Sequence, residues 1–123
     1  MAKVMIVDDN RDIVETLKSI MEMEGHETET AYDGEEFLER VESVNPDLVL
    51  LDVMMPGLTT KEILGRLKER ELNHFKIIFV TVVRFSEDER RRLMTEFNIQ
   101  DFVTKPFNLS DLVKKVKIAL LQK

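Results

Sequence analysis

The sequence predicts an α/β fold in which five strands alternate with five helices. Short apolar runs bounded by turn residues alternate with longer stretches whose apolar residues recur at helical spacing. The chain has 123 residues, 43% of them apolar, so we expect one domain over residues 1–123 with enough apolar side chains to fill its interior. Repeated strand–helix–strand units need crossover connections, and right-handed crossovers place helices on both faces of a parallel sheet.

The first two strand–helix pairs lie in the N-terminal part of the chain. Residues 4–7 are uniformly apolar and predict a buried strand. The helix that follows carries its apolar residues on one stripe and ends at Gly25. Residues 27–30 read Glu-Thr-Glu-Thr, which suits only a strand at a thinly covered sheet edge. A second helix over residues 37–44 ends at an Asn-Pro pair.

The rest of the chain predicts three further strands and three helices. In order, they are a strand at Leu48–Leu51, a helix around residues 63–67, a strand at 77–80, a helix at 86–97, a short strand at 101–103 and a helix at 109–120. The helix at 86–97 has few apolar positions, so we expect it to be the least firmly held.

The apolarity of the strands predicts their order in the sheet. The strands that start at Val4, Leu48 and Ile77 are the most apolar and belong in the middle, whereas the polar second strand and the short fifth strand belong at the edges. This arrangement fits a flavodoxin-like (βα)5 three-layer sandwich with a five-stranded parallel sheet of order 2-1-3-4-5.

The composition argues against several classes of function. The 24 acidic residues exceed the 18 basic ones, and the net charge of −6 disfavours contact with nucleic acid or a membrane surface. The absence of cysteine excludes disulfides, zinc–thiolate sites and thiol nucleophiles. No apolar run approaches the roughly 20 residues that cross a bilayer, and none resembles a signal peptide, so we expect a cytoplasmic protein.

Polar side chains follow four of the five predicted strands. They are Asp8 and Asp9, Asp52, Thr81 and Lys105. In such a sheet, ligands bind beyond the carboxyl ends of the strands where the strand order reverses. One loop aspartate alone most often caps a helix, but three at matching strand ends repel one another unless a cation lies among them, and oxygen ligands favour Mg²⁺. With the lysine and the hydroxyl, this set can hold a phosphoryl group, and an aspartate can be its nucleophilic acceptor.

These motifs resemble the receiver domain of two-component response regulators, the family that includes the chemotaxis protein CheY. The resemblance covers essentially the whole chain, and the motifs are specific in their order and spacing. They are Val7-Asp8-Asp9, Ala31-Tyr32-Asp33-Gly34, Leu51-Asp52-Val53-Met54-Met55-Pro56-Gly57, Thr81 and Asp101-Phe102-Val103-Thr104-Lys105-Pro106-Phe107.

The resemblance implies a phosphoacceptor and a metal site. Asp52 is expected to accept a phosphoryl group from a sensor histidine kinase or a phosphotransfer protein. Asp9, Asp52 and the backbone carbonyl of Met54 are expected to bind Mg²⁺ directly, and Asp8 through a water molecule. The implied chemistry is phosphoryl acceptance and slow self-dephosphorylation, without the turnover of an enzyme.

The resemblance also implies a switch. Lys105 is expected to pair with a phosphoryl oxygen and Thr81 to hydrogen-bond it, which lets Phe102 turn inward. The face formed by the fourth helix, the fifth strand and the fifth helix would then change shape and control an output domain or target protein. The bond between Lys105 and Pro106 is expected to be cis, an isomer that proline tolerates.

Several residues depart from the family's usual pattern. Val82 replaces a small residue and is expected to narrow access for the phosphodonor. Met54 and Val83 are apolar at positions that influence attacking water, which predicts a long-lived phosphoryl group. Asn98-Ile99 replaces a Gly-Ala pair, and Asn98 is expected to supply the left-handed backbone conformation of the glycine. For Thr60, which replaces another glycine, the sequence offers no explanation.

Four charged residues resemble positions through which some transcription-factor receivers dimerise: Arg91, Asp101, Asp111 and Lys115. The resemblance therefore implies a homodimer on phosphorylation, although exposed charges of this kind are most often only solvated.

Two other functions stay open at this stage. A haloacid-dehalogenase-like phosphatase also uses an aspartate nucleophile and Mg²⁺, but it needs a second aspartate where this chain has Met54. The second alternative is a receiver-like binding module that works without phosphorylation. Val82 favours this alternative because it is expected to narrow access for the phosphodonor.

Overall fold

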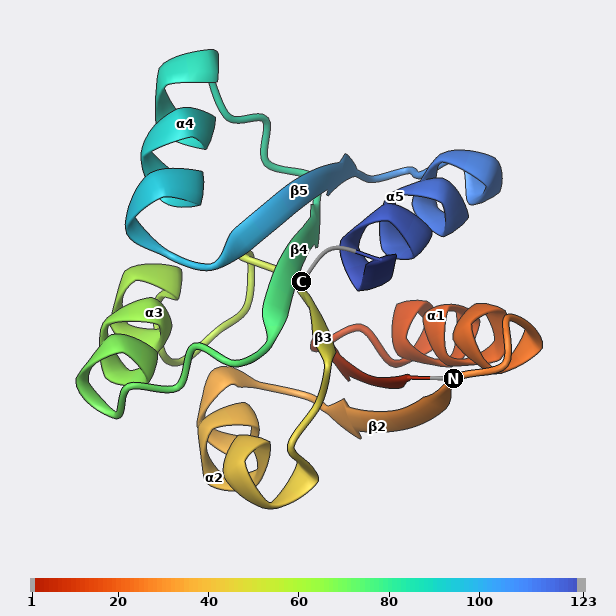
Figure 1. Ribbon diagram of the computed structural model, residues 1–123, viewed down its shortest axis with the longest axis horizontal. Helices are drawn as coiled ribbons and strands as arrows, with labels where there is room; N and C mark the ends of the chain where they lie inside the picture. The colour runs from red at the N-terminus through yellow and green to blue at the C-terminus, as the bar shows by residue number, and fades with distance from the viewer. Residues whose placement is uncertain (1, 122–123) are drawn as a thin grey trace.

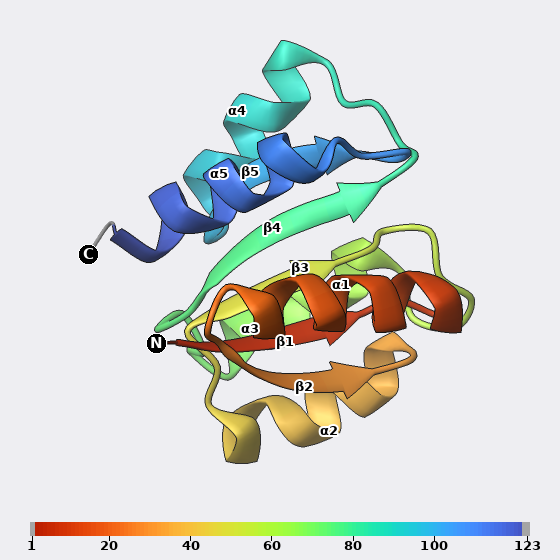
Figure 2. The same cartoon turned by 90° about the vertical axis from the view of Figure 1, so that its right-hand side faces the viewer.

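The computed structural model describes residues 2–121 and contains one parallel sheet with helices on both faces (Figures 1 and 2). The strand order is β2-β1-β3-β4-β5, and all neighbouring strands are parallel. The elements are β1 (Lys3–Val7), α1 (Arg11–Met23), β2 (Glu27–Ala31), α2 (Gly34–Val44), β3 (Leu48–Leu51), α3 (Thr60–Glu69), β4 (Lys76–Thr81), α4 (Glu87–Glu96), β5 (Ile99–Thr104) and α5 (Leu109–Leu121). The flavodoxin-like class and the order 2-1-3-4-5 are confirmed.

The helices are divided between the two faces of the sheet because side chains of each strand point alternately to either face. Val4 and Ile6 of β1 pack with the apolar residues of α1 and α5, whereas Met5 and Val7 pack with those of α2 and α3. Figure 1 shows α1 and α5 on one side of the sheet and the other three helices on the opposite side. Every residue of β3 is buried, as expected for a central strand.

Helix α4 is the most loosely packed helix of the described chain, since it contains no buried residue. Leu93 contacts the core only as a partly buried side chain, and so does Phe97 just beyond the helix. The helix begins at a capping box in which Ser86 and Glu89 each bond the other's backbone N–H. The sequence-based expectation for this segment therefore agrees with the structure.

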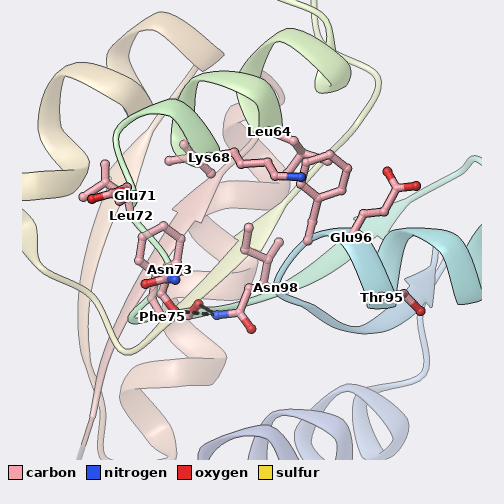
Figure 3. A pocket seen from close by; sticks show the side chains of 12 residues that line it. Leu64, Lys68, Glu71, Leu72, Asn73, Phe75, Thr95, Glu96 and Asn98 are labelled. Carbon is pink, nitrogen blue, oxygen red and sulfur yellow. Dashed lines mark hydrogen bonds between the residues drawn. The ribbon is translucent and has the colours of Figure 1, made fainter.

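A cavity of about 630 Å³ separates the C-terminal ends of α3 and α4 (Figure 3). Leu64 and Phe75 contribute apolar side chains to its wall, and the ammonium of Lys68 lies 5.5 Å from the centre of the Phe97 ring. The cavity adjoins the first residues of β4 and β5. It therefore lies at the edge of the sheet where the strands begin, opposite the edge formed by their carboxyl ends.

Strand β5 is longer than the sequence predicts, since it spans six residues and not only 101–103. The pairing with β4 continues through an irregularity: Ile77 pairs with Ile99, and the next residue, Ile78, pairs with Asp101. A bulge of this kind accommodates the extra residue, Gln100. Because Gln100 and Asp101 are polar, the first half of β5 contains no apolar run that would predict a strand.

Asn98 does not have the left-handed conformation expected for it, because the non-glycine residues with positive φ within residues 2–121 are Asn45 and Glu71. Its side-chain amide instead donates hydrogen bonds to the backbone carbonyls of Asn73 and Phe75. Asn98 thus joins the turn before β5 to the turn before β4 through its side chain.

No helix within residues 2–121 combines the length and the apolarity that a membrane-spanning segment requires.

Candidate functional site

Three aspartates meet at the carboxyl ends of β1 and β3. The pairing of Val7 with Leu51 in these adjacent strands brings the next residues, Asp8 and Asp52, side by side. The backbone N–H of Asp52 continues the ladder by donating to the carbonyl of Val7 at 3.0 Å. Asp8, Asp9 and Asp52 each place one carboxylate oxygen within 4.8 Å of the others. This is the point at which the strand order reverses, where such sheets bind ligands.

The three carboxylates differ in their exposure to solvent. Asp8 is 2% exposed and Asp52 is 5% exposed, whereas Asp9 is exposed. Burial raises the pKa of the Asp8 carboxyl above its ordinary value, and the hydrogen bonds from Lys105 and the Asn10 N–H only partly oppose this effect. The cluster therefore holds a charge that its burial disfavours.

Lys105 brings a positive charge to the two buried acids from the end of β5. Its ammonium lies 2.6 Å from Oδ2 of Asp8 and 3.4 Å from Oδ2 of Asp52. Its backbone N–H donates to the carbonyl of Thr81 at 2.8 Å, and its bond to Pro106 is cis, as expected. Three carboxylates and one ammonium leave a formal charge of −2, a deficit that a divalent cation can balance.

The Asp52 carboxylate has two distinct environments. Its Oδ1 accepts the backbone N–H of Met54 at 3.0 Å, whereas its Oδ2 faces Lys105. Asp8 is also oriented locally, since its Oδ1 accepts the N–H of Asn10 at 2.9 Å. Asn10 in turn caps α1 by accepting two backbone N–H groups of that helix, so the helix start and the acid site share one turn.

Thr81 and Phe102 occupy the same edge of the sheet on the side of β4 and β5. The Thr81 side chain is buried, and its hydroxyl accepts the N–H of Val83 at 3.3 Å. Phe102 is only 6% exposed and packs against Phe79 and Phe85 with ring centres 5.6 and 5.4 Å away. Phe102 is thus buried in this structure, and its turn inward on phosphorylation stays a prediction.

The four residues of the expected dimer face lie on α4, β5 and α5, apart from the acid cluster, and three of them have ion-pair partners. Lys115 pairs with Asp111 at 3.3 Å and donates to the carbonyl of Phe102 at 2.8 Å. Arg91 pairs with Asp88 at 3.8 Å. Asp101 accepts the backbone N–H of the next residue.

Three residues near the site were not assigned a role from the sequence. The Thr60 hydroxyl donates to the carbonyl of Val53 at 3.2 Å, which gives this unexplained residue a contact next to Asp52. Phe85 packs on Phe102, and the Arg90 guanidinium lies 5.3 Å from the centre of the Phe102 ring. Two features of the sequence could have indicated a role for Thr60. It is a second hydroxyl residue directly after Thr59, which caps α3, and the loop between β3 and α3 is short enough for its side chain to reach the end of β3.

The donor set fits Mg²⁺. All three side chains offer carboxylate oxygens, which hard divalent cations prefer, and the exposed Asp9 leaves one side open to water. Whether the Met54 carbonyl and a water on Asp8 complete the ligand set stays a prediction.

Comparison with known proteins gives one consistent family. The family model described as "Response regulator receiver domain" matches residues 4–117. The chain is 36% identical over 118 residues to the alkaline phosphatase synthesis transcriptional regulatory protein PhoP of Bacillus subtilis, covering 96% of this chain and 48% of that protein. It is 37% identical over 120 residues to the transcriptional regulatory protein CpxR of Klebsiella pneumoniae, covering 98% of this chain and 50% of that protein. The chain thus spans about half the length of these two relatives.

A solved structure extends the comparison to three dimensions. The response regulator protein TrrA of Thermotoga maritima, solved in complex with Mg²⁺-BeF, is 37% identical to this chain. The alignment covers 98% of this chain and 100% of that one, with a TM-score of 0.79.

Proposed function

Because the chain belongs to the response regulator receiver family, we propose that Asp52 accepts a phosphoryl group in a Mg²⁺-dependent reaction and thereby controls the face formed by α4, β5 and α5. The observation that carries this proposal is the cluster of Asp8, Asp9 and Asp52 within 4.8 Å, with the Lys105 ammonium against two of the three. A receiver of this family is a phosphoryl acceptor and not a catalyst with turnover.

Asp52 is suited to be the nucleophile because its position is fixed and its surroundings compensate the incoming charge. One of its carboxylate oxygens attacks the phosphorus atom of the donor and forms an O–P bond. The P–N bond to the histidine of a kinase breaks, its electron pair stays with the imidazole, and that imidazole takes up a proton from water. Lys105, 3.4 Å from Oδ2 of Asp52, is placed to pair with a phosphoryl oxygen.

Asp9 and Asp52 would hold Mg²⁺ directly together with the Met54 carbonyl, and Asp8 would act through a water. When bound, the ion neutralises negative charge on the phosphoryl oxygens. The relative TrrA, whose structure contains Mg²⁺-BeF, supports the binding of Mg²⁺.

The switch is proposed to run from Thr81 to α4. A hydrogen bond from the Thr81 hydroxyl to a phosphoryl oxygen would compete with its present bond to the Val83 N–H, and so would move the loop after β4. Phe85 lies in that loop and packs on Phe102, which couples the loop to β5. Helix α4 follows directly and contains no buried residue, so it is the element that moves at the lowest free-energy cost.

The family implies partnership with a histidine kinase, while the particular kinase and output are proposals. PhoP and CpxR are transcriptional regulators about twice the length of this chain. We therefore propose that this receiver controls an output domain or target protein, and that it dimerises on phosphorylation through Arg91, Asp101, Asp111 and Lys115. A cytoplasmic location stays a prediction.

The two alternative functions make different predictions. A haloacid-dehalogenase-like phosphatase would hydrolyse phosphomonoesters repeatedly, which we expect this chain not to do because Met54 stands where the acid would be. A phosphorylation-independent module would take up no phosphoryl group, and Val82, a β-branched residue that is 57% exposed beside the site, is the feature that favours it.

One experiment separates the proposed function from the phosphorylation-independent module. The protein is incubated with excess acetyl phosphate, with Mg²⁺ or with EDTA, and its intact mass is measured. The proposal predicts a gain of one phosphoryl group that requires Mg²⁺ and is absent in Asp52→Asn. No gain with donor and Mg²⁺ in excess would support the phosphorylation-independent module.

A further inference from the structure

The loop between β3 and α3 is closed by a side-chain hydrogen bond. Thr60, the first residue of α3, donates its hydroxyl to the carbonyl of Val53 at 3.2 Å. The helix does not need this hydroxyl for its own start, because the neighbouring Thr59 accepts the N–H of Glu62 and forms a complete capping box. The Thr60 hydroxyl is therefore free to act on the strand end instead of on the helix.

The carbonyl that Thr60 holds belongs to the same peptide unit as the N–H that holds Asp52. A peptide unit is planar, so the Val53 carbonyl and the Met54 N–H rotate together. The Met54 N–H donates to Oδ1 of Asp52 at 3.0 Å. Thr60 on one edge and Asp52 on the other thus restrain this single unit, and rotation of the unit would break both hydrogen bonds.

We propose that Thr60 is a positioning residue for phosphoryl acceptance, because its hydroxyl fixes the peptide unit between Val53 and Met54 and through it the orientation of the Asp52 carboxylate. This inference rests on the proposed function of Asp52. It concerns the residue that the sequence left unexplained.

The orientation matters because the two oxygens of Asp52 face different groups. Oδ1 accepts the Met54 N–H, and Oδ2 lies 3.4 Å from the Lys105 ammonium. If the peptide unit turns, Oδ1 loses its donor and the carboxylate can rotate about its own bond. The direction of the Met54 carbonyl, a predicted Mg²⁺ ligand, depends on the same residue. Met54 needs such a restraint, since its side chain is 60% exposed and the loop reaches a glycine with φ of 91° three residues later.

The test compares Thr60→Val, which keeps the shape and removes the hydroxyl, with Thr60→Ser, which keeps the hydroxyl. Thr16→Val is the matched control, since the Thr16 hydroxyl also donates to a backbone carbonyl, at 2.9 Å, but within α1. Two readouts are used: hydrogen exchange of the Met54 amide by NMR without Mg²⁺, and the Mg²⁺ dissociation constant by titration. Thr60→Ala is a second hydroxyl-free variant if Thr60→Val is poorly folded.

Thr60→Val is expected to raise the exchange rate of the Met54 amide and the Mg²⁺ dissociation constant, each by about two- to tenfold, the range that one neutral hydrogen bond supports. Thr60→Ser and Thr16→Val are expected to behave as wild type. A Thr60→Val protein that only unfolds more readily, with unchanged Met54 exchange and unchanged Mg²⁺ affinity, would show a purely structural role and overturn the inference.

The two proposals fail separately. If wild type does not bind Mg²⁺, the proposed function fails, and the exchange of the Met54 amide still decides whether Thr60 positions the peptide unit. If wild type binds Mg²⁺ and the hydroxyl-free variants bind it equally well, only the role of Thr60 is refuted.

Discussion

The ammonium of Lys105 lies 2.6 Å from a carboxylate oxygen of Asp8, a residue 97 positions away in the sequence. Asp52, the proposed phosphoacceptor, is farther from the same ammonium, at 3.4 Å. The lysine thus compensates chiefly the charge of Asp8, which is the more buried of the two acids. It also remains within reach of Asp52, the proposed phosphoacceptor. Because these charges compensate one another, removing the charge of Asp8 and removing the charge of Lys105 should change the free energy of unfolding in opposite directions.

Asp8→Asn is expected to stabilise the protein in the absence of Mg²⁺. Burial disfavours the charged form of Asp8, and the pKa of this carboxyl is raised above its ordinary value of 3.8. The amide keeps the shape without the charge, so the free energy of unfolding should rise by about 1 kcal/mol, measured by urea denaturation with EDTA present.

The stabilisation by Asp8→Asn should depend on pH. Because the folded-state pKa is raised, the ionised group destabilises the fold fully above that pKa, and this destabilisation disappears as the pH falls towards the unfolded-state value of 3.8. The two proteins should therefore differ at neutral pH and converge in acid. A constant difference over this range would show that the charge of Asp8 is not the cause.

Lys105→Met is expected to destabilise the protein. It leaves the Asp8 carboxylate buried without the ammonium that now lies 2.6 Å away, and the loss of a hydrogen bond to a charged group is worth about 2 kcal/mol. The loss should be smaller in the Asp8→Asn background, where only the more distant Asp52 carboxylate, 3.4 Å from the ammonium, loses its partner. Equal losses in both backgrounds, by urea denaturation, would mean that Lys105 acts through its packing.

Val82→Ala is expected to accelerate phosphorylation by acetyl phosphate several-fold. Val82 directly follows Thr81 and is 57% exposed, and the smaller alanine is expected to leave more room for the phosphodonor. The rate constant is followed by intact mass at fixed donor and Mg²⁺ concentrations, with Val82→Thr as a control of similar shape. If Val82→Thr is accelerated equally, the shape of residue 82 does not limit access.

The phosphoryl group on Asp52 is expected to be long-lived. Met54 presents an exposed apolar side chain beside Asp52, and Val83 is apolar and partly buried next to Thr81, so neither offers a group that orients attacking water. Met54→Glu should shorten the half-life of the phosphorylated protein, while Met54→Leu should preserve it. A wild-type half-life of only seconds would contradict this account.

The fold and the acid site were predictable from the sequence because each depends on a local pattern. Apolar runs at residues 4–7 and Leu48–Leu51 marked the central strands, and the residues that follow those strands must meet wherever parallel strands pair. Asp8 and Asp52 converge because their strands are neighbours, and the Lys105 side chain reaches both from the end of β5.

Other features depend on side-chain contacts that spacing does not encode. The role of Thr60 appears only when the loop returns its hydroxyl to Val53, and the role of Asn98 only when its amide reaches Asn73. The sequence predicts too late a start for β5 because the bulge beside Ile77 interrupts the apolar pattern with polar residues. Phe102 also packs against Phe85, which lies in a loop with no recognisable period.

The central claim is that Asp52 is the phosphoacceptor, and the most direct test locates the phosphoryl group. The protein is phosphorylated with acetyl phosphate and Mg²⁺ and reduced with borohydride, which converts an acyl phosphate to an alcohol. Peptide mass spectrometry then identifies the modified residue. Reduction is expected at Asp52 and at neither Asp8 nor Asp9, whereas a label on either of those residues, or no label at all, would contradict the proposed role of Asp52.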